Sequence, residues 1–373
     1  MKEGNNMNNQ MSKEEFAKEY LQYPYPYQLN REHKPYEGPH VLDDPPKFHE
    51  KLLEYGERPY WSPDGKRIVF VESNYGDICE IDFETREVRN LTKNLGEHHS
   101  FLRVLFLANG DYLLIGPKVF KDRQISRGTE SELWVMDKDA KTAPKPLGRA
   151  IFEGCGVSTV SNKITYAMNG RHDPNLESPD DYEVHVTEIS YGPNGPELGQ
   201  DQVIYRANNG HRPEPQDFRY NDTEVIMAEY FNSPFSNPDN WNCTVKGIHI
   251  ETGEVTTFID ETWIHNECEG IFPDHEHICL ECSRDFINSH PPIDLWKLKL
   301  DGTGRRVRMT QMIDHLPWRA NNSNVSPDGK WLAYMVNTVS DEPGYGRGLG
   351  LLNLQEWEKS QEGQQWEYPI PKK

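Results

Sequence analysis

The chain lacks any apolar run long enough to cross a membrane as a helix, which takes about 18 to 20 residues. Its N-terminal stretch, MKEGNNMNNQMSKEEFAKEYLQ, has no apolar core and therefore does not have the form of a signal peptide. Basic residues are also in short supply, because 40 Lys and Arg stand against 60 Asp and Glu, a formal net charge of −20. We therefore expect neither a membrane nor a nucleic-acid partner, and a cytoplasmic protein unless a leader was removed.

Cysteines are few and follow no framework that is typical of disulfides or zinc sites. Cys279 and Cys282 are the closest pair, and they lie in an expected strand, where positions three apart point to opposite faces. A shared zinc ion is therefore not favoured there. We interpret the six cysteines as buried or half-buried free thiols in a reducing compartment; they are Cys79, Cys155, Cys243, Cys268, Cys279 and Cys282.

Two common catalytic motifs are missing as well. No Gly-x-Ser-x-Gly sequence occurs, which excludes the nucleophile elbow of a prolyl-oligopeptidase-like hydrolase domain. No Gly-x-x-x-x-Gly-Lys-Ser/Thr loop is present either, so a phosphate-binding loop of that type is excluded. The glycine-rich stretch GYGRGLG (344–350) joins two expected strands instead of opening a helix, and it predicts a hairpin loop.

A strand–turn–strand pattern, in contrast, recurs along the chain. Ser62-Pro63-Asp64-Gly65 has the composition of a tight turn and separates two short apolar runs, and Ser326-Pro327-Asp328-Gly329 repeats it near the other end. Weaker copies lie between them at 104–116, 156–168, 215–229 and 269–282. The turns follow one another at intervals of about 45 to 60 residues, which indicates a structural repeat with variable loops.

A second pair of strand signals follows each copy, so each unit offers four short antiparallel strands. Such units cannot bury their sheet faces alone and become stable when they pack radially as blades. The sequence therefore predicts an all-β fold, a six-bladed antiparallel β-propeller, with seven blades as the alternative. We assign the propeller to residues 55–373 and treat residues 1–54 as an N-terminal extension that includes the closing strand.

The residues around SPDGK resemble a known repeat. An alternating apolar strand follows the turn, and a further strand then ends in Asp with a Thr-Gly or Asp-Gly turn, as in the TolB-type, WD-like propeller repeat. The resemblance covers roughly residues 55 to 370 and is closest in the first and last copies. It implies a propeller but no single function, because propellers host binding proteins, lyases, hydrolases and scaffolds.

The sequence of the N-terminal extension predicts a short helix, the closing strand and a clamp. SKEEFAKEYLQ (12–22) begins with a Ser that can cap a helix and places apolar residues on one face, so a short helix is expected. GPHVLDD (38–44) is our candidate for the strand that closes the ring, with the tail QQWEYPI (364–370) beside it. The proline-rich remainder is expected to form a clamp across one face.

Three histidines share a register in the segments that lead into the first strand of a unit. His99 and His211 each precede their turn position by eleven residues, and His265 precedes its own by ten. The first strand of a propeller blade is innermost, so these segments should line the mouth of the central channel. The alternative is coincidence among 14 histidines, or lead-in loops that are polar only because they face solvent.

The histidines have polar companions in the same segments. As catalytic groups we predict His99, His211, His265 and Glu267. As substrate-binding groups we predict Arg103, Arg212, Glu214, Glu269, Trp318, Arg319 and Asn321, next to Asn322. Imidazole has an ordinary pKa of about 6.5 and can act as acid or base, which suits β-elimination on a uronate. Alternatively, His211 and His265 could hold a divalent cation, Mn²⁺ or Zn²⁺, as the electrophile.

A fainter resemblance supports the same chemistry. NGHRPEPQDFRYND (209–222) and HNECEGIFPDH (265–275) resemble two lead-ins of propeller-type oligogalacturonate lyases, which are TolB-like and hold a metal through channel histidines. The chain departs from that family because its last blade has no closely spaced His pair and offers Asn321 and Asn322 instead.

The prediction for function is therefore a carbohydrate-active lyase or hydrolase that works in the channel on a small-molecule or oligosaccharide ligand. We expect a monomer. Two alternatives remain: a TolB-like binding or scaffold propeller that is not an enzyme, and a biosynthetic cyclase or isomerase.

Overall fold

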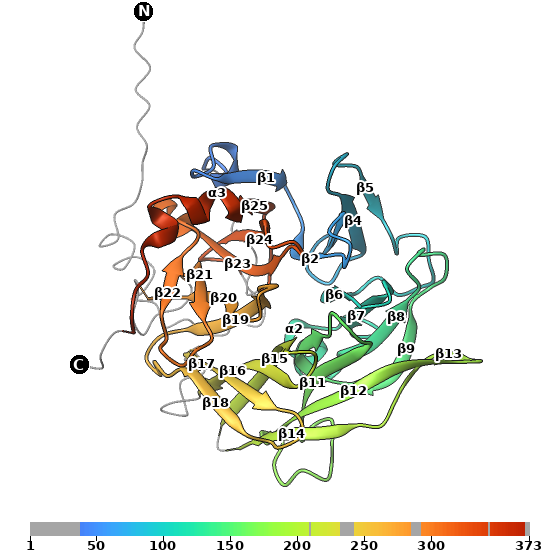
Figure 1. The fold of residues 1–373 in the computed structure, drawn as a ribbon. Helices are drawn as coiled ribbons and strands as arrows, with labels where there is room; N and C mark the ends of the chain where they lie inside the picture. Colours follow the sequence, from blue (N-terminus) through green and yellow to red (C-terminus); the bar gives the residue numbers. More distant parts are fainter. Residues whose placement is uncertain (1–37, 209, 232–241, 285–291, 342–343, 370–373) are drawn as a thin grey trace, which may run out of the picture.

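The computed structural model describes residues 38–208, 210–231, 242–284, 292–341 and 344–369 of the 373-residue chain. In this part of the chain, six antiparallel sheets are arranged around a common centre (Figure 1). Helices are short and lie outside the sheets. The predicted six-bladed β-propeller is confirmed, and the seven-bladed alternative is not.

The first three sheets follow one another along the chain. Blade one contains β2 (Glu57–Trp61), β3 (Arg67–Val71), β4 (Ile78–Asp82) and β5 (Val88–Asn90). Blade two contains β6 (Arg103–Phe106), β7 (Tyr112–Gly116), β8 (Glu132–Met136) and β9 (Lys145–Ala150), with the short helix α2 (Arg123–Gly128) between β7 and β8. Blade three contains β10 (Phe152–Val157), β11 (Lys163–Asn169) and β12 (Tyr182–Gly192), and β12 pairs with both β13 (Gly195–Leu198) and β14 (Gln202–Ala207).

The last three sheets complete the ring. Blade four contains β15 (His211–Arg219), β16 (Glu224–Phe231), β17 (Cys243–His249) and β18 (Val255–Ile259). Blade five contains β19 (Asn266–Ile271), β20 (His277–Cys282), β21 (Asp294–Lys299) and β22 (Arg306–Arg308). Blade six contains β23 (Trp318–Val325), β24 (Trp331–Thr338) and β25 (Leu349–Asn353), joined by β1 (His49–Leu53). The helix α3 (Leu354–Lys359) and the 3-10 turn η2 (Met312–His315) contact blade six, whereas the 3-10 turn η3 (Glu362–Gln364) contacts α3 and β22 of blade five.

The two Ser-Pro-Asp-Gly turns form for the reason that the sequence suggests. The N–H of Gly65 donates to the carbonyl of Ser62 at 2.9 Å, and the Ser62 hydroxyl donates to Asp64 at 2.6 Å. Gly65 has a φ of +68°, which an L side chain rarely adopts. Gly329 has a φ of +71° in the other copy. Both turns therefore join the first and second strands of a blade as predicted.

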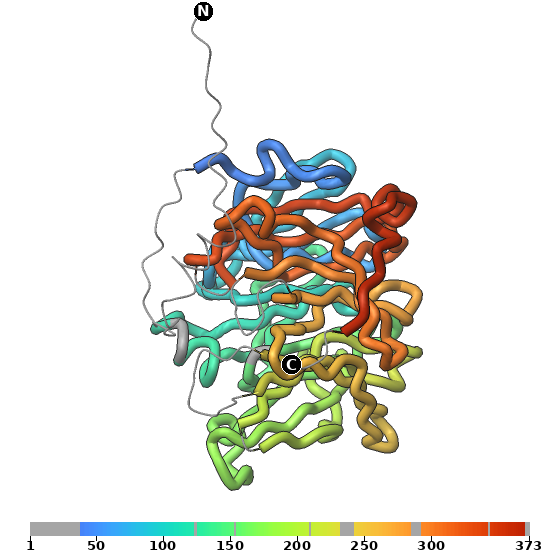
Figure 2. The backbone as a smooth tube through the Cα atoms, turned by 90° about the vertical axis from the view of Figure 1, so that its left-hand side faces the viewer, coloured from blue at the N-terminus to red at the C-terminus, as the bar shows by residue number. Residues whose placement is uncertain are grey.

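The ring is closed by β1, which pairs antiparallel with β25. In the side view of Figure 2, this N-terminal strand lies beside the last strands of the chain. The prediction that residues 38–44 form the closing strand is wrong. His40 instead caps a 3-10 turn, η1 (Val41–Asp43), by accepting from the N–H of Leu42 at 3.1 Å. The helix predicted at 12–22 lies outside the described residues.

The C-terminal tail also departs from the prediction. Glu367 and Arg306 exchange main-chain hydrogen bonds of 2.7 and 3.0 Å, so the tail adds a bridge to the outer edge of blade five. It therefore does not lie beside the closing strand. Gly304 and Pro369 pack closely at the same place, which holds the tail there through side-chain contact as well.

Apolar side chains pack between neighbouring blades rather than in one central core. Blades one and two share a cluster that includes Val69, Phe101, Tyr112 and Trp134, and blades six and one share another around Phe70 and Met335. All six cysteines are buried and none forms a disulfide. No helix in the described part of the chain is long and apolar enough to span a membrane. The centre of the ring is consequently left to polar side chains.

Candidate functional site

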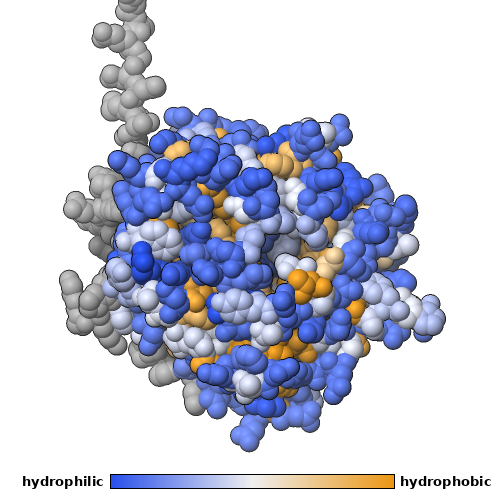
Figure 3. Space-filling model, viewed as in Figure 1, coloured by the Kyte–Doolittle hydropathy of each residue, from blue (hydrophilic) through white to orange (hydrophobic). Residues whose placement is uncertain are grey.

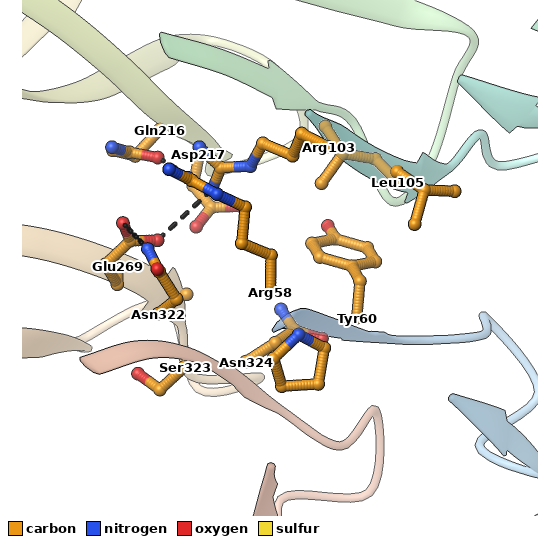
Figure 4. A pocket seen from close by; sticks show the side chains of 13 residues that line it. Arg58, Tyr60, Arg103, Leu105, Gln216, Asp217, Glu269, Asn322, Ser323 and Asn324 are labelled. Carbon is orange, nitrogen blue, oxygen red and sulfur yellow. Dashed lines mark hydrogen bonds and ion pairs between the residues drawn. The ribbon is translucent and has the colours of Figure 1, made fainter. Parts of the chain in front are cut away.

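A polar pocket lies at the centre, where the first strands of the blades meet. Figure 4 shows its thirteen lining residues, which come from β2, β6, β15, β19 and β23. The space between these residues measures about 320 Å³ when the solvent at its open side is included. The face shown in Figure 3 is hollowed near the middle of the ring. The polar members of the lining are Arg58, Tyr60, Arg103, Gln216, Asp217, Glu269, Asn322, Ser323 and Asn324.

Irregular pairing occurs in the innermost strands of five blades, including four of the five strands that line the pocket; β6 pairs regularly. The register shifts in β2, β10, β15, β19 and β23, and each shift falls in the innermost strand of its blade. Arg58 and Asn322 have φ values of +50° and +42° within their shifts. Bulges bend a strand and re-aim side chains, and they are frequent beside active sites. The bulges thus present side chains to the channel that regular alternation would send between the blades.

Arg103 and Glu269 form the central ion pair of the pocket. An Nη2 hydrogen of Arg103 is directed to Glu269 Oε2 at 3.2 Å, and the same nitrogen lies 3.2 Å from Gln216 Oε1. Asn322 Nδ2 donates to the other Glu269 oxygen at 3.3 Å. The structure therefore brings together residues of blades two, four, five and six, and both Arg103 and Glu269 were predicted from the sequence as ligand-binding groups.

Two carboxyl groups of the pocket have strongly perturbed acidity. Burial raises the pKa of Glu269 to about 7, although Arg103 acts in the opposite direction. Burial likewise raises the pKa of Asp217 to about 7, against a hydrogen bond of 2.9 Å that its carboxylate accepts from the N–H of Ile271. Groups with such pKa values can accept and donate protons near neutral pH. Perturbed acids in a cleft are typical of functional sites.

A second cluster adjoins the pocket in blade five. One ligand atom each from His265, Glu267 and Glu281 lies within 4.8 Å of the others. His265 Nε2 lies 3.4 Å from Glu267 Oε2, while its Nδ1 lies 3.8 Å from the sulfur of Cys243. The main-chain N–H of His265 donates to Ser283 Oγ at 3.1 Å, which fixes the main chain at this position. The ring is thus held with Nε2 toward the carboxylates.

Glu281 presents an electrostatic problem that a cation would solve. Its side chain is 3% exposed, and its Oε1 accepts from the N–H of Asn322 at 2.5 Å. Burial raises its pKa well above the ordinary value, and the charges of Glu267 and Glu269 raise it further, whereas the hydrogen bond from Asn322 and the charge of Arg319 act in the opposite direction. In the described part of the chain, no Lys or Arg forms an ion pair with Glu281. One imidazole and two carboxylates are ligands that suit Zn²⁺ or Mn²⁺.

The other two predicted histidines are not members of this cluster. His99 Nδ1 lies 2.7 Å from Asp77 Oδ1, and its side chain is half-exposed in the segment that leads into β6. His211 Nδ1 lies 3.4 Å from Glu229 Oε2 at the start of β15. The carboxylates near His265 are those of Glu267 and Glu281, whereas His211 faces Glu229. The catalytic roles of His99 and His211 remain predictions.

The remaining predicted residues do not line the pocket and contact other parts of the chain. Arg212 lies over the ring of Tyr230, with 5.4 Å between its guanidinium carbon and the ring centroid, and Glu214 is buried against Gly154. Trp318 is buried beside His40, and Arg319 donates to Asn337 Oδ1 at 2.7 Å. Like these residues, Asn321 is buried and is not among the pocket-lining residues.

Glu281, Asp217 and Arg58 were not among the predicted site residues. Glu281 and Asp217 lie outside the segments that lead into the first strands, whereas Arg58 lies in the lead-in YGERP (55–59) but carried no distinguishing signal there. Glu281 lies on a second strand, but it is the one charged residue in the otherwise apolar stretch ICLEC. A buried strand that keeps a carboxylate is a signal that could have identified it. Asp217 and Arg58 reach the pocket through register shifts, which no local pattern announces.

Comparison with family models gives no match, and neither does comparison with curated protein sequences. Among solved structures, a gluconolactonase from Xanthomonas campestris, XC5397, matches with a TM-score of 0.52 and 12% identity, over 82% of this chain and 88% of that one. A putative TolB from Agrobacterium tumefaciens matches with a TM-score of 0.50 and 12% identity, over 69% and 76%. The tricorn protease matches with a TM-score of 0.50 and 13% identity, over 87% of this chain but 27% of the protease. The resemblance to TolB-like propellers is thus confirmed for the fold, and a propeller enzyme and a scaffold are both compatible with it.

Proposed function

We propose that the protein is a lyase or hydrolase that acts in its channel on a carbohydrate-like ligand with the help of a divalent cation. The observation that carries the proposal is the group of His265, Glu267 and Glu281 beside the Arg103–Glu269 pocket, in which His265 and Glu281 are buried and Glu267 is partly buried. A scaffold needs no cluster of closely spaced carboxylates at its centre, since burying such groups costs free energy of folding. We infer that the carboxylates are placed together here because their charge serves the function of the site.

The three side chains would hold the cation through Nε2 of His265 and the carboxylate oxygens of the two glutamates. The contact between Nδ1 and Cys243 leaves Nε2 directed to that position. A divalent cation would supply charge stabilisation for an oxygen of the ligand. Its positive charge would also offset the repulsion among the carboxylates of blade five.

The pocket residues would bind the ligand and move the proton. Arg103, Gln216 and Asn322 provide donors, and Asp217 and Glu269 provide acceptors, a balance that suits a polyhydroxylated sugar carrying one carboxyl group. A carboxyl with a pKa of about 7 is half ionised at neutral pH, so Glu269 or Asp217 can serve as base or as acid. Abstraction of a proton α to a uronate carboxyl is the reaction that this arrangement supports best.

The gluconolactonase of this fold has, by its name, a sugar-acid lactone as its substrate. At 12% identity this likeness concerns the fold, so we use it only to choose substrates. The test is to assay purified protein with Mn²⁺ or Zn²⁺ on oligogalacturonate, reading unsaturated-uronate absorbance, and on gluconolactone, reading acid release. Turnover that falls by about 10²-fold or more in Glu281→Gln is expected.

Glu356→Gln is the matched control, because Glu356 is exposed on α3 and pairs with Lys359 on the same helix. It should leave turnover unchanged. Absence of turnover on both substrates, together with absence of bound metal, would instead favour the scaffold.

A further inference from the structure

The innermost strand of blade six contains a bulge beside the proposed cation site. Asn321 pairs with Met335 and Asn324 with Ala333, so β23 carries one residue more than β24 over this interval. Within the bulge Asn322 has a φ of +42°, in the left-handed region. Asn tolerates this conformation better than most residues, and a β-branched residue does not.

Asn322 contacts two carboxylates of the neighbouring blade through different groups. Its main-chain N–H donates to Glu281 Oε1 at 2.5 Å, and its side-chain Nδ2 donates to Glu269 Oε1 at 3.3 Å. Glu281 belongs to the cation cluster, whereas Glu269 belongs to the pocket. One residue of blade six therefore joins both parts of the site in blade five.

We infer that Asn322 is a positioning residue, whose left-handed main chain orients Glu281 as a cation ligand while its side chain holds Glu269. This inference rests on the proposed cation site. One carboxylate oxygen of Glu281 accepts the short hydrogen bond from Asn322, and the other oxygen would bind the cation. Groups that orient a metal ligand in this way typically contribute about 10- to 100-fold to metal affinity.

The two contacts of Asn322 can be separated by substitution. Asn322→Gly keeps the left-handed main chain and its N–H but removes the amide that reaches Glu269. Asn322→Val disfavours the left-handed conformation and should displace the N–H from Glu281. Asn322→Ala should have an intermediate effect, because alanine is strained there but not β-branched.

The experiment titrates each full-length variant with Mn²⁺ and follows free Mn²⁺ by electron paramagnetic resonance. We expect Asn322→Gly to bind Mn²⁺ within about threefold of the wild type and Asn322→Val to bind about 10- to 100-fold more weakly. Melting without metal confirms that each variant folds. Ala140→Val is the matched control, since Ala140 has a φ of +49° in a partly buried turn of blade two, and it should not change Mn²⁺ affinity.

The outcomes distinguish this inference from the proposed function. If the wild type binds Mn²⁺ and folded Asn322→Val binds it equally well, or if the Gly and Val variants lose affinity to the same extent, the positioning role of the main chain is overturned. If Asn322→Val does not fold, a loss of affinity in Asn322→Ala that Asn322→Gly does not share supports the inference, and equal affinities in these two variants overturn it. If the wild type binds no Mn²⁺, the cation site itself is refuted.

Discussion

Acid should destabilise the strand that closes the ring, because one of its own residues is a buried, neutral histidine. His49 lies on β1 and is 8% exposed; its Nδ1 lies 2.8 Å from the hydroxyl of Tyr334 on β24. Burial lowers the pKa of His49 from 6.5 to about 4. The folded protein therefore favours the neutral ring, and protonation favours release of the strand.

The size of the effect follows from this difference in pKa. Because the pKa is lower in the folded protein than in the unfolded chain, the contribution of His49 to stability is complete above pH 6.5 and declines as the pH falls to about 4. At 1.36 kcal/mol for each pKa unit, the loss amounts to about 3 kcal/mol across that window. Below pH 4 the contribution should no longer change.

The assay is urea unfolding of the wild type and of His49→Gln from pH 7.5 to 3.5. Glutamine does not titrate, so the difference between the two free energies of unfolding isolates His49 from other groups. The comparison is needed because Asp217 and Glu269 have raised pKa values, so their protonation should stabilise the folded protein as the pH falls. A difference that stays constant between pH 7 and 4 would falsify the assignment of a neutral, buried His49.

Three further predictions concern stability and the pocket. Arg306→Met should lower the free energy of unfolding in urea by about 3 to 5 kcal/mol, because it removes the cation that is paired with the buried carboxylate of Glu261. The double substitution with Glu261→Met should recover most of that loss. Gly156→Ala would place a Cβ 2.5 Å from the main-chain oxygen of Gln216, so we expect it to lower the free energy of unfolding by about 1 to 3 kcal/mol. An unchanged melting temperature would contradict the close packing of blades three and four. Arg103→Met removes the cation that lowers the pKa of Glu269, so the acidic limb of the kcat/KM profile should move to higher pH, and an unmoved limb would exclude Glu269 as the base.

Local signals in the sequence were sufficient for most of the fold. The turn at Ser62–Gly65 and its copy at Ser326–Gly329 depend on residues that are adjacent in the chain, so their conformation and the repeat could be predicted. The closing strand depends on pairing with β25, some 300 residues away, which no local pattern encodes. The segment 38–44, which we predicted as the closing strand, instead forms a 3-10 turn that is capped by His40.

The site was predicted in part for the same reason. Glu267, Glu269 and Arg103 were identified because they lie in or near the lead-in segments, which topology places at the channel. Glu281 and Asp217 were not, because their approach depends on a second strand and on a register shift. Sequence spacing also suggested that His99, His211 and His265 act together. Spacing alone does not predict that His99 contacts Asp77 and that His211 contacts Glu229.

The cation site is tested most directly by calorimetric titration of the purified full-length protein with Mn²⁺ and Zn²⁺, alongside Glu281→Gln and the control Glu356→Gln. Our account predicts one cation per chain, bound at least about 10-fold more weakly by Glu281→Gln and unchanged in the control. Anomalous scattering from a crystal grown with the metal should place the ion between His265, Glu267 and Glu281. A wild type that binds neither metal, or an ion located elsewhere in the chain, would contradict the account.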